Sequence, residues 1–115
     1  MLALTVACRC GSSIKRLATN ALSDAPVAIC TIGESVLGVA VTGNGVVYTV
    51  GLASGTLYKC DTAATSPVVE TVEVIPSWQN PSSCSANRMN MATGPSGGIY
   101  IADPCGERMI VHTPS

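Results

Sequence analysis

Charged residues are scarce in this chain. Asp, Glu, Lys and Arg make up 11% of its 115 residues, and the formal net charge is −1. Proteins that bind nucleic acid or anionic lipid attract the phosphate groups with a surplus of Lys and Arg. Because this sequence has no such surplus, we expect no nucleic-acid partner.

Long hydrophobic runs are missing as well. No segment approaches the roughly 18 consecutive apolar residues that a membrane-spanning helix requires, so the sequence predicts no membrane span. Phe is absent and aromatic residues make up 3% of the chain, whereas 47% of the residues are hydrophobic, mainly Val, Ala, Leu and Ile. Side chains branched at Cβ suit a packed, pleated sheet, which indicates an all-β protein.

Turn-forming residues are plentiful and evenly spread. The 11 Gly and 7 Pro are distributed along the chain instead of being gathered in a linker. That distribution is typical of tight turns between short strands. A chain of 115 residues suits one domain, so residues 1–115 are expected to form a single domain.

An internal repeat organises the sequence. The segment 38–61 aligns with 90–113, and a weaker third copy occupies 2–19. Three pairs of similar positions anchor the alignment: Tyr48 with Tyr100, Asn44 with Ser96, and Gly45 with Gly97. Asn-Gly and Gly-rich turns favour tight hairpins, so consecutive strands of each copy should be antiparallel. The segments 26–33 and 67–75 each begin at or just after a Pro and are expected to add a fourth, outer strand.

Four antiparallel strands per repeat are typical of β-propeller blades. The runs Gly-Val-Ala-Val at 38–41 and Tyr-Ile-Ala-Asp at 100–103, the latter followed by Arg108, resemble the NHL repeat of six-bladed propellers. The resemblance implies a partial β-propeller of three consecutive blades of antiparallel strands. These blades would be 1–34, 35–76 and 77–115, with three, four and three strands, so that the first and last are incomplete.

A propeller fragment of this kind would leave the outer faces of its end blades uncovered. Each blade normally buries both faces, so strands such as those at 45–50 and 97–102 are apolar at successive positions. Open apolar faces are rare on soluble monomers. The sequence therefore predicts self-association through the open blade faces, or poor folding of the isolated chain.

The loops at one edge of the blades are where binding is expected, because a scaffold's loops commonly carry its function. The insertion 77–88 lengthens one of them and contains the only Trp. The residues expected to contact a protein or glycan partner are Trp78, Gln79, Asn80, Arg88, Asp103 and Arg108. Two structural alternatives stay open: Trp78 could pack under the loop as an anchor, and Asp103 could cap its own loop.

Six cysteines are present, without a Cys-x-x-Cys pair, and the lone His112 falls in an expected strand. That pattern favours no metal site. Cys84 and Cys105 fall on neighbouring loops and could form a disulfide, which would favour an extracellular or secretory compartment. Cys30 and Cys60 fall in apolar strands, where they are expected to act as small hydrophobic residues.

The acidic residues form no recognisable catalytic constellation, and no cofactor is expected. The sequence thus favours a non-catalytic recognition scaffold, or a fragment of one. Two alternatives remain. The chain could be part of a six-bladed propeller hydrolase or lyase with a metal in its channel, for which Asn90 is the one polar candidate in the channel strands. It could also be a truncated remnant without independent activity.

Overall fold

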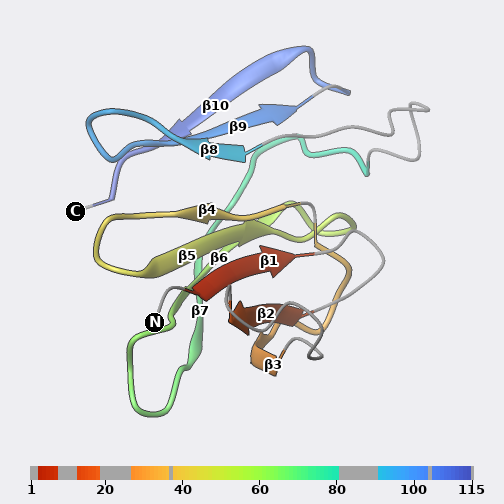
Figure 1. Cartoon of the computed structure of the whole chain (residues 1–115). Coiled ribbons are helices and arrows are strands. Elements are labelled where there is room, and N and C mark those ends of the chain that lie inside the picture. Colours follow the sequence, from red (N-terminus) through yellow and green to blue (C-terminus); the bar gives the residue numbers. More distant parts are fainter. Residues whose placement is uncertain are drawn as a thin grey trace.

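The chain folds into three antiparallel β-sheets in a computed structural model that describes residues 3–7, 13–18, 27–36, 38–80, 91–103 and 105–114. Ten strands lie in these residues, divided three, four and three among the sheets (Figure 1). The expectation of an all-β chain with this division of strands is confirmed. None of the described residues is helical, so none contributes a helix that could cross a membrane.

The first sheet has the order β1-β2-β3, formed by Ala3–Ala7, Ser13–Ala18 and Val27–Thr31. Both strand pairs are antiparallel, and Ile14 of β2 lies opposite Cys30 of β3. The register shifts between Ile14 and Lys15, so the pairing of β2 with β3 is irregular there. These pairings place two apolar residues side by side on one face of the sheet.

The middle sheet has the order β4-β5-β6-β7, with bounds Ala40–Val41, Val46–Val50, Thr56–Asp61 and Val69–Val74. The third sheet repeats its first three strands as β8-β9-β10, with bounds Met91–Thr93, Ile99–Asp103 and Arg108–His112. The two segments aligned by the sequence repeat therefore form equivalent antiparallel meanders, as predicted.

The equivalent hairpins turn at equivalent glycines. Gly45 has φ of +84° and Gly97 has φ of +85°, a backbone region that residues with a Cβ atom rarely adopt. Gly45 donates to the Thr42 carbonyl at 3.0 Å, and Gly97 donates to the Gly94 carbonyl at 3.0 Å. The same turn chemistry thus produces the same connection in both copies.

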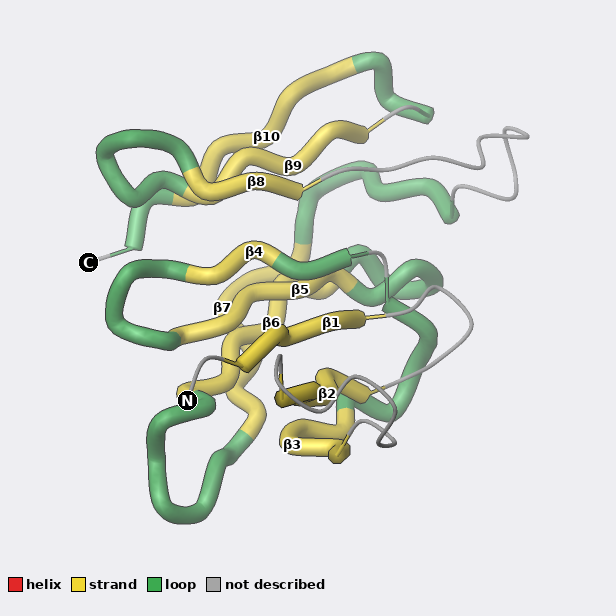
Figure 2. Tube along the Cα trace, in the orientation of Figure 1, coloured by secondary structure: helices red, strands yellow, loops and turns green. Residues whose placement is uncertain are grey.

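The middle sheet lies between the other two, as both views of the chain show (Figures 1 and 2). One hydrophobic cluster lies between the first and middle sheets and contains Ile14, Cys30, Val47 and Cys60. A larger cluster lies between the middle and third sheets and includes Tyr48, Val50, Leu57, Ile99 and Ile101. Residues 47–50 of β5 are all buried because this strand is covered on both faces, which explains its consecutive apolar positions.

The third sheet is buried on one face. Ile99 and Ile101 of β9 are fully buried against the middle sheet, whereas Met109 and Val111 of β10 are 60% and 52% exposed. The exposed side chains lie on the outer face, together with the half-buried Tyr100. This open face is what the sequence led us to expect at an end sheet, although self-association through it stays a prediction.

Cys30 and Cys60 form a disulfide, which corrects the expectation that both would act as free hydrophobic residues. The bond joins β3 of the first sheet to β6 of the middle sheet across a sequence separation of 30 residues. Both cysteines are buried. They were expected to be buried, but their pairing depends on how the sheets stack, and each strand taken alone does not indicate its partner.

Candidate functional site

Loops from the middle and third sheets meet at one edge of the molecule, together with the segment that leaves the first sheet. We call this the loop edge and define it by the described segments 32–36, 51–55, 75–80 and 105–108, together with Asp103. The hairpin turns 42–45, 61–68 and 94–98 lie at the other ends of the strands and form the turn edge. The loop edge contains most of the residues that the sequence marked as candidates for binding.

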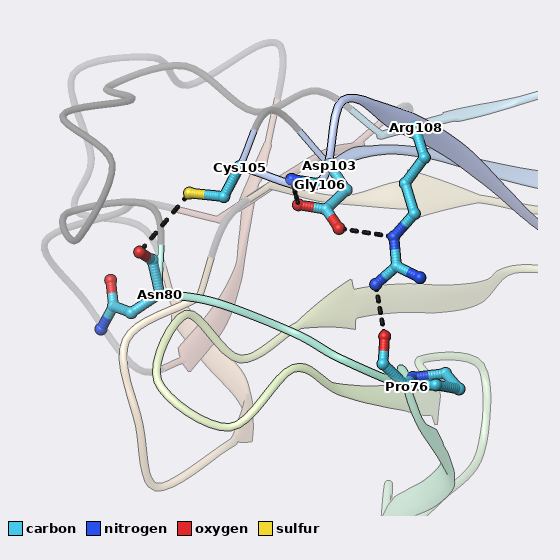
Figure 3. A network of polar contacts seen from close by, with 6 residues as sticks. All are labelled: Pro76, Asn80, Asp103, Cys105, Gly106 and Arg108. Carbon is cyan, nitrogen blue, oxygen red and sulfur yellow. Dashed lines mark hydrogen bonds and ion pairs between the residues drawn. The ribbon is translucent and has the colours of Figure 1, made fainter.

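Asp103 and Arg108 form the centre of the loop edge in the third sheet (Figure 3). Asp103 is 2% exposed; its Oδ1 accepts a hydrogen bond from the Gly106 amide at 3.1 Å, and its Oδ2 accepts one from Arg108 Nε at 2.8 Å. Arg108 also donates from Nη2 to the carbonyl oxygen of Pro76, in the loop that follows the middle sheet. Asp103 therefore caps its own loop, and Arg108 ties that loop to the next one.

Trp78 acts as an anchor. Its indole N–H donates to the Leu52 carbonyl at 2.9 Å, and the ring packs against the core between the middle and third sheets. A Cβ on Gly55 would lie 2.3 Å from the Trp78 Cγ atom, so the ring covers this glycine closely. Trp78 thus joins the loop after β7 to the turn between β5 and β6, as one of the two alternatives for this residue predicted.

The other candidates divide between exposed and enclosed positions. Gln79 is exposed and Asn80 is half-buried. The Cys105 sulfur lies 3.7 Å from the Asn80 carbonyl oxygen (Figure 3). Because Cys105 is disulfide-bonded, its sulfur has no hydrogen to donate, so we regard this approach as a packing contact. Arg88, and Cys84 as the expected disulfide partner, lie outside the described residues.

Glu34 is a loop-edge residue that the sequence did not single out. Its carboxylate accepts hydrogen bonds from the Tyr58 hydroxyl at 2.6 Å, the Ser54 hydroxyl at 2.7 Å and the Ser54 amide at 3.1 Å. Burial raises the pKa of Glu34, but these hydrogen bonds outweigh it and the net pKa lies below the ordinary value of 4.5. Burial and the nearby Glu34 carboxylate raise the pKa of Tyr58.

Glu34 and Asp103 cap equivalent loops, Glu34 in the middle sheet and Asp103 in the third sheet. Gly51 of the middle sheet stands at the repeat position of Asp103, and a Cβ there would lie 2.2 Å from the Glu34 carboxyl carbon. The Ser54 amide that Glu34 caps follows Gly51 by the same number of residues as Gly106 follows Asp103. The repeat that lacks its own aspartate therefore receives a carboxylate from the preceding segment.

A cleft of about 680 Å³ opens at the turn edge, away from the predicted binding residues. Polar and charged side chains line much of it, among them Asn44, Lys59, Asp61 and Glu70. Lys59 Nζ and Glu70 Oε2 lie 3.6 Å apart, and their side chains are 42% and 63% exposed. The residues that form this cleft come from three separate turns, from strands β5, β6 and β7, and from Pro114. No local sequence pattern joins these segments.

Within the part of the chain that the structure describes, no group of three or more His, Cys, Asp or Glu side chains lies arranged to hold a metal ion. No family model, curated protein or solved structure matches this chain.

Proposed function

We propose that this chain is a non-catalytic recognition scaffold of the β-propeller type, or a fragment of one, that binds a protein or glycan partner through its loop edge. Three features support the propeller part of this proposal: stacked antiparallel sheets, a four-stranded middle sheet, and an internal repeat with equivalent meanders. The NHL resemblance adds Asp103 and Arg108, whose ion pair stabilises the loop between β9 and β10.

The main support for a recognition role is a set of side-chain hydrogen bonds that join neighbouring loops. Glu34 joins the segment after β3 to the turn after β5, Trp78 joins the loop after β7 to that same turn, and Arg108 joins the third sheet to the loop after β7. Loops held in this way lose little conformational freedom when a partner binds. The loop edge is thus a preorganised surface.

The same bonds favour recognition over a hydrolase or lyase activity. The carboxylates of Glu34 and Asp103 are each engaged by several donors that hold loops in place. The exposed residues around them are small or polar, namely Ser35, Ala53, Ser54, Gln79, Gly106 and Glu107. Such a surface, with little net charge, suits the hydrogen-bonding groups of a glycan or the mixed surface of a protein.

A site-directed crosslinking experiment tests this proposal. A photo-crosslinking residue is placed at exposed Gln79 on the loop edge or at exposed Thr65 on the turn edge, in otherwise identical chains. We expect a partner to be captured from Gln79 and not from Thr65, and we expect Gln79→Ala to weaken binding to any glycan found on a glycan array. Equal capture from both positions, or binding that Thr65→Ala abolishes, would contradict the loop edge as the binding surface.

The turn-edge cleft is a second candidate, for a small polar ligand such as a sugar. Its volume of about 680 Å³ lies in the range of ligand pockets. The test is a titration with neutral monosaccharides followed by amide chemical shifts. Shifts confined to 42–46 and 59–70 would support the cleft, and their loss in Asn44→Ala would identify Asn44 as a ligand-binding residue. Shifts confined to the loop edge would exclude it.

A further inference from the structure

The outer edge of β10 has no partner among the described strands. In the third sheet β10 pairs with β9 alone. Its repeat equivalent in the middle sheet, β6, pairs with β5 on one side and with β7 on the other. The repeat therefore shows what kind of element belongs beside β10, namely one extended antiparallel strand.

The sequence of β10 leaves this edge unprotected. Edge strands commonly avoid unwanted pairing through charged side chains or Pro. β7, the outer strand of the middle sheet, contains Glu70 and Glu73 among its six residues. In β10, by contrast, the central residues Met109, Ile110 and Val111 are apolar, and charge is restricted to its ends. The centre of β10 therefore lacks the charged side chains that protect the edge of β7.

The surroundings of β10 indicate which side chains such a strand should have. On the outer face, Met109 and Val111 are 60% and 52% exposed, so apolar side chains would pair with them. On the inner face, His112 Nδ1 lies 3.2 Å from Glu73 Oε1, which brings an acidic side chain of β7 next to the edge. The Glu73 side chain is 50% exposed, so a basic side chain could reach it.

We propose that the edge of β10 binds an extended peptide in which apolar and basic residues alternate. The peptide adds as an antiparallel strand, as β7 does to β6, with its apolar residues beside Met109 and Val111 and a basic residue near Glu73. In the repeat alignment Val111 corresponds to Lys59 of the middle sheet, which pairs with Glu70. Because Val111 replaces that lysine, the peptide needs an apolar residue where β7 has a glutamate.

A single strand fits this position better than a second copy of the chain. The middle sheet extends one strand further than the third sheet, because β7 has no described counterpart beside β10. His112 and Arg108 of β10 reach Glu73 of β7 and Pro76 just after it, so β7 lies close to the edge of β10. A second copy joined through β10 would bring its own β7 into the same region, where the glutamates of the two copies would repel each other.

Binding of synthetic peptides tests the proposal. The full oxidised chain is titrated with an acetylated and amidated Val-Lys-Val-Lys-Val peptide, and with the matched Val-Glu-Val-Glu-Val peptide, while backbone amide exchange is followed. We expect the lysine peptide to bind more tightly and to slow exchange at 108–112. Val111→Lys should weaken binding by about fivefold, and Glu73→Gln should reduce the preference for the lysine peptide by a similar factor.

The control is Val41→Lys, which places the same charge on a 42% exposed valine of β4, at the opposite edge of the middle sheet. This variant should bind the lysine peptide like the unaltered chain, and circular dichroism is used to check that all three variants are folded. Three outcomes would overturn the proposal. No peptide binds at millimolar concentration, Val111→Lys and Val41→Lys weaken binding equally, or the glutamate peptide binds as tightly as the lysine peptide. Dimerisation that protects 108–112 without peptide would assign the edge to a second copy and would also overturn it.

Discussion

Two carboxylates cap equivalent loops from different positions in the sequence. Asp103 caps the loop that follows its own strand, whereas Glu34 reaches the corresponding middle-sheet loop from the segment that precedes it. In each loop one backbone amide donates to a carboxylate oxygen, from Ser54 in the middle sheet and from Gly106 in the third. The capped position in the loop is the same, and which residue supplies the oxygen differs from one repeat to the next.

Asp103→Ala is expected to destabilise the chain by about 1–3 kcal/mol. The substitution leaves the Gly106 amide and the Arg108 guanidinium without their carboxylate partner, in a loop where Asp103 itself is 2% exposed. The measurement is urea unfolding at neutral pH. Glu107→Ala, on the exposed neighbour in the same loop, is the control and should change stability by less than about 0.5 kcal/mol.

Glu34 should make stability depend on pH in the acidic range. Its pKa in the folded chain lies below the ordinary value of 4.5 because of hydrogen bonds from Tyr58 and Ser54, which outweigh the opposing effect of burial. A lowered pKa stabilises the fold above the unfolded value, and this stabilisation is lost as pH falls through the folded value. Glu34→Gln should therefore melt at a lower temperature than the unaltered chain at pH 7.

That difference in melting temperature should shrink as the pH falls below 4.5. Melting curves at a series of pH values from neutral to acidic measure it. Glu70→Gln serves as the control, since the Glu70 side chain is 63% exposed and holds no loop amide. A difference between Glu34→Gln and the unaltered chain that stays constant across the whole series would contradict the role of the carboxylate.

Among the elements, the turn between β5 and β6 depends most on a glycine. Gly55 has φ of +71°, and a Cβ there would lie 2.3 Å from the Trp78 Cγ atom. The residue therefore needs both left-handed backbone geometry and the absence of a side chain. Its amide also donates to the Gly51 carbonyl at 2.9 Å, which closes the turn on which Trp78 rests.

Gly55→Ala is expected to cost roughly 2–4 kcal/mol, because backbone strain and a displaced Trp78 ring add together. Trp78 is the only tryptophan, so its fluorescence reports directly on the displacement. For comparison, Gly43→Ala in the hairpin between β4 and β5 meets nothing within 4 Å and should be nearly neutral. Equal stability of the two variants would show that the ring does not pack on Gly55.

At the scale of the whole molecule, the first sheet is joined to the middle sheet by the Cys30–Cys60 disulfide and by the small cluster around Ile14 and Val47. A disulfide that closes a loop of this length typically contributes about 3–4 kcal/mol through the unfolded state. The double variant Cys30→Ala/Cys60→Ala should be destabilised by roughly that amount.

Loss of the disulfide should also affect the three sheets unequally. Backbone amides of the first sheet should exchange faster in the double variant than amides of β5, which the third sheet still covers. Hydrogen exchange resolved by residue measures this difference. Uniform acceleration in all three sheets would instead indicate that the chain unfolds as one cooperative unit.

Much of the strand arrangement could be predicted from the sequence, because the signals are local. Asn44-Gly45 and the glycines at 94–98 specify tight hairpins through their backbone freedom, and the apolar run at 46–50 indicates a strand covered on both faces. The aligned repeat then implies that both copies adopt the same meander. Burial of Trp78 was also open as an alternative because tryptophan is usually buried, and capping by Asp103 was open because its partner Gly106 is only three residues away in the chain.

Tertiary structure decided the features that join distant segments. The sequence contained no local sign that Cys30 pairs with Cys60, that Glu34 caps the turn at 51–55, or that three turns enclose a cleft beside Lys59. Each of these depends on how one sheet is placed against another, and that placement results from packing of side chains across the sheet faces. Turn chemistry and strand periodicity act between neighbours in the chain, whereas the contacts between sheets act between residues that only folding brings together.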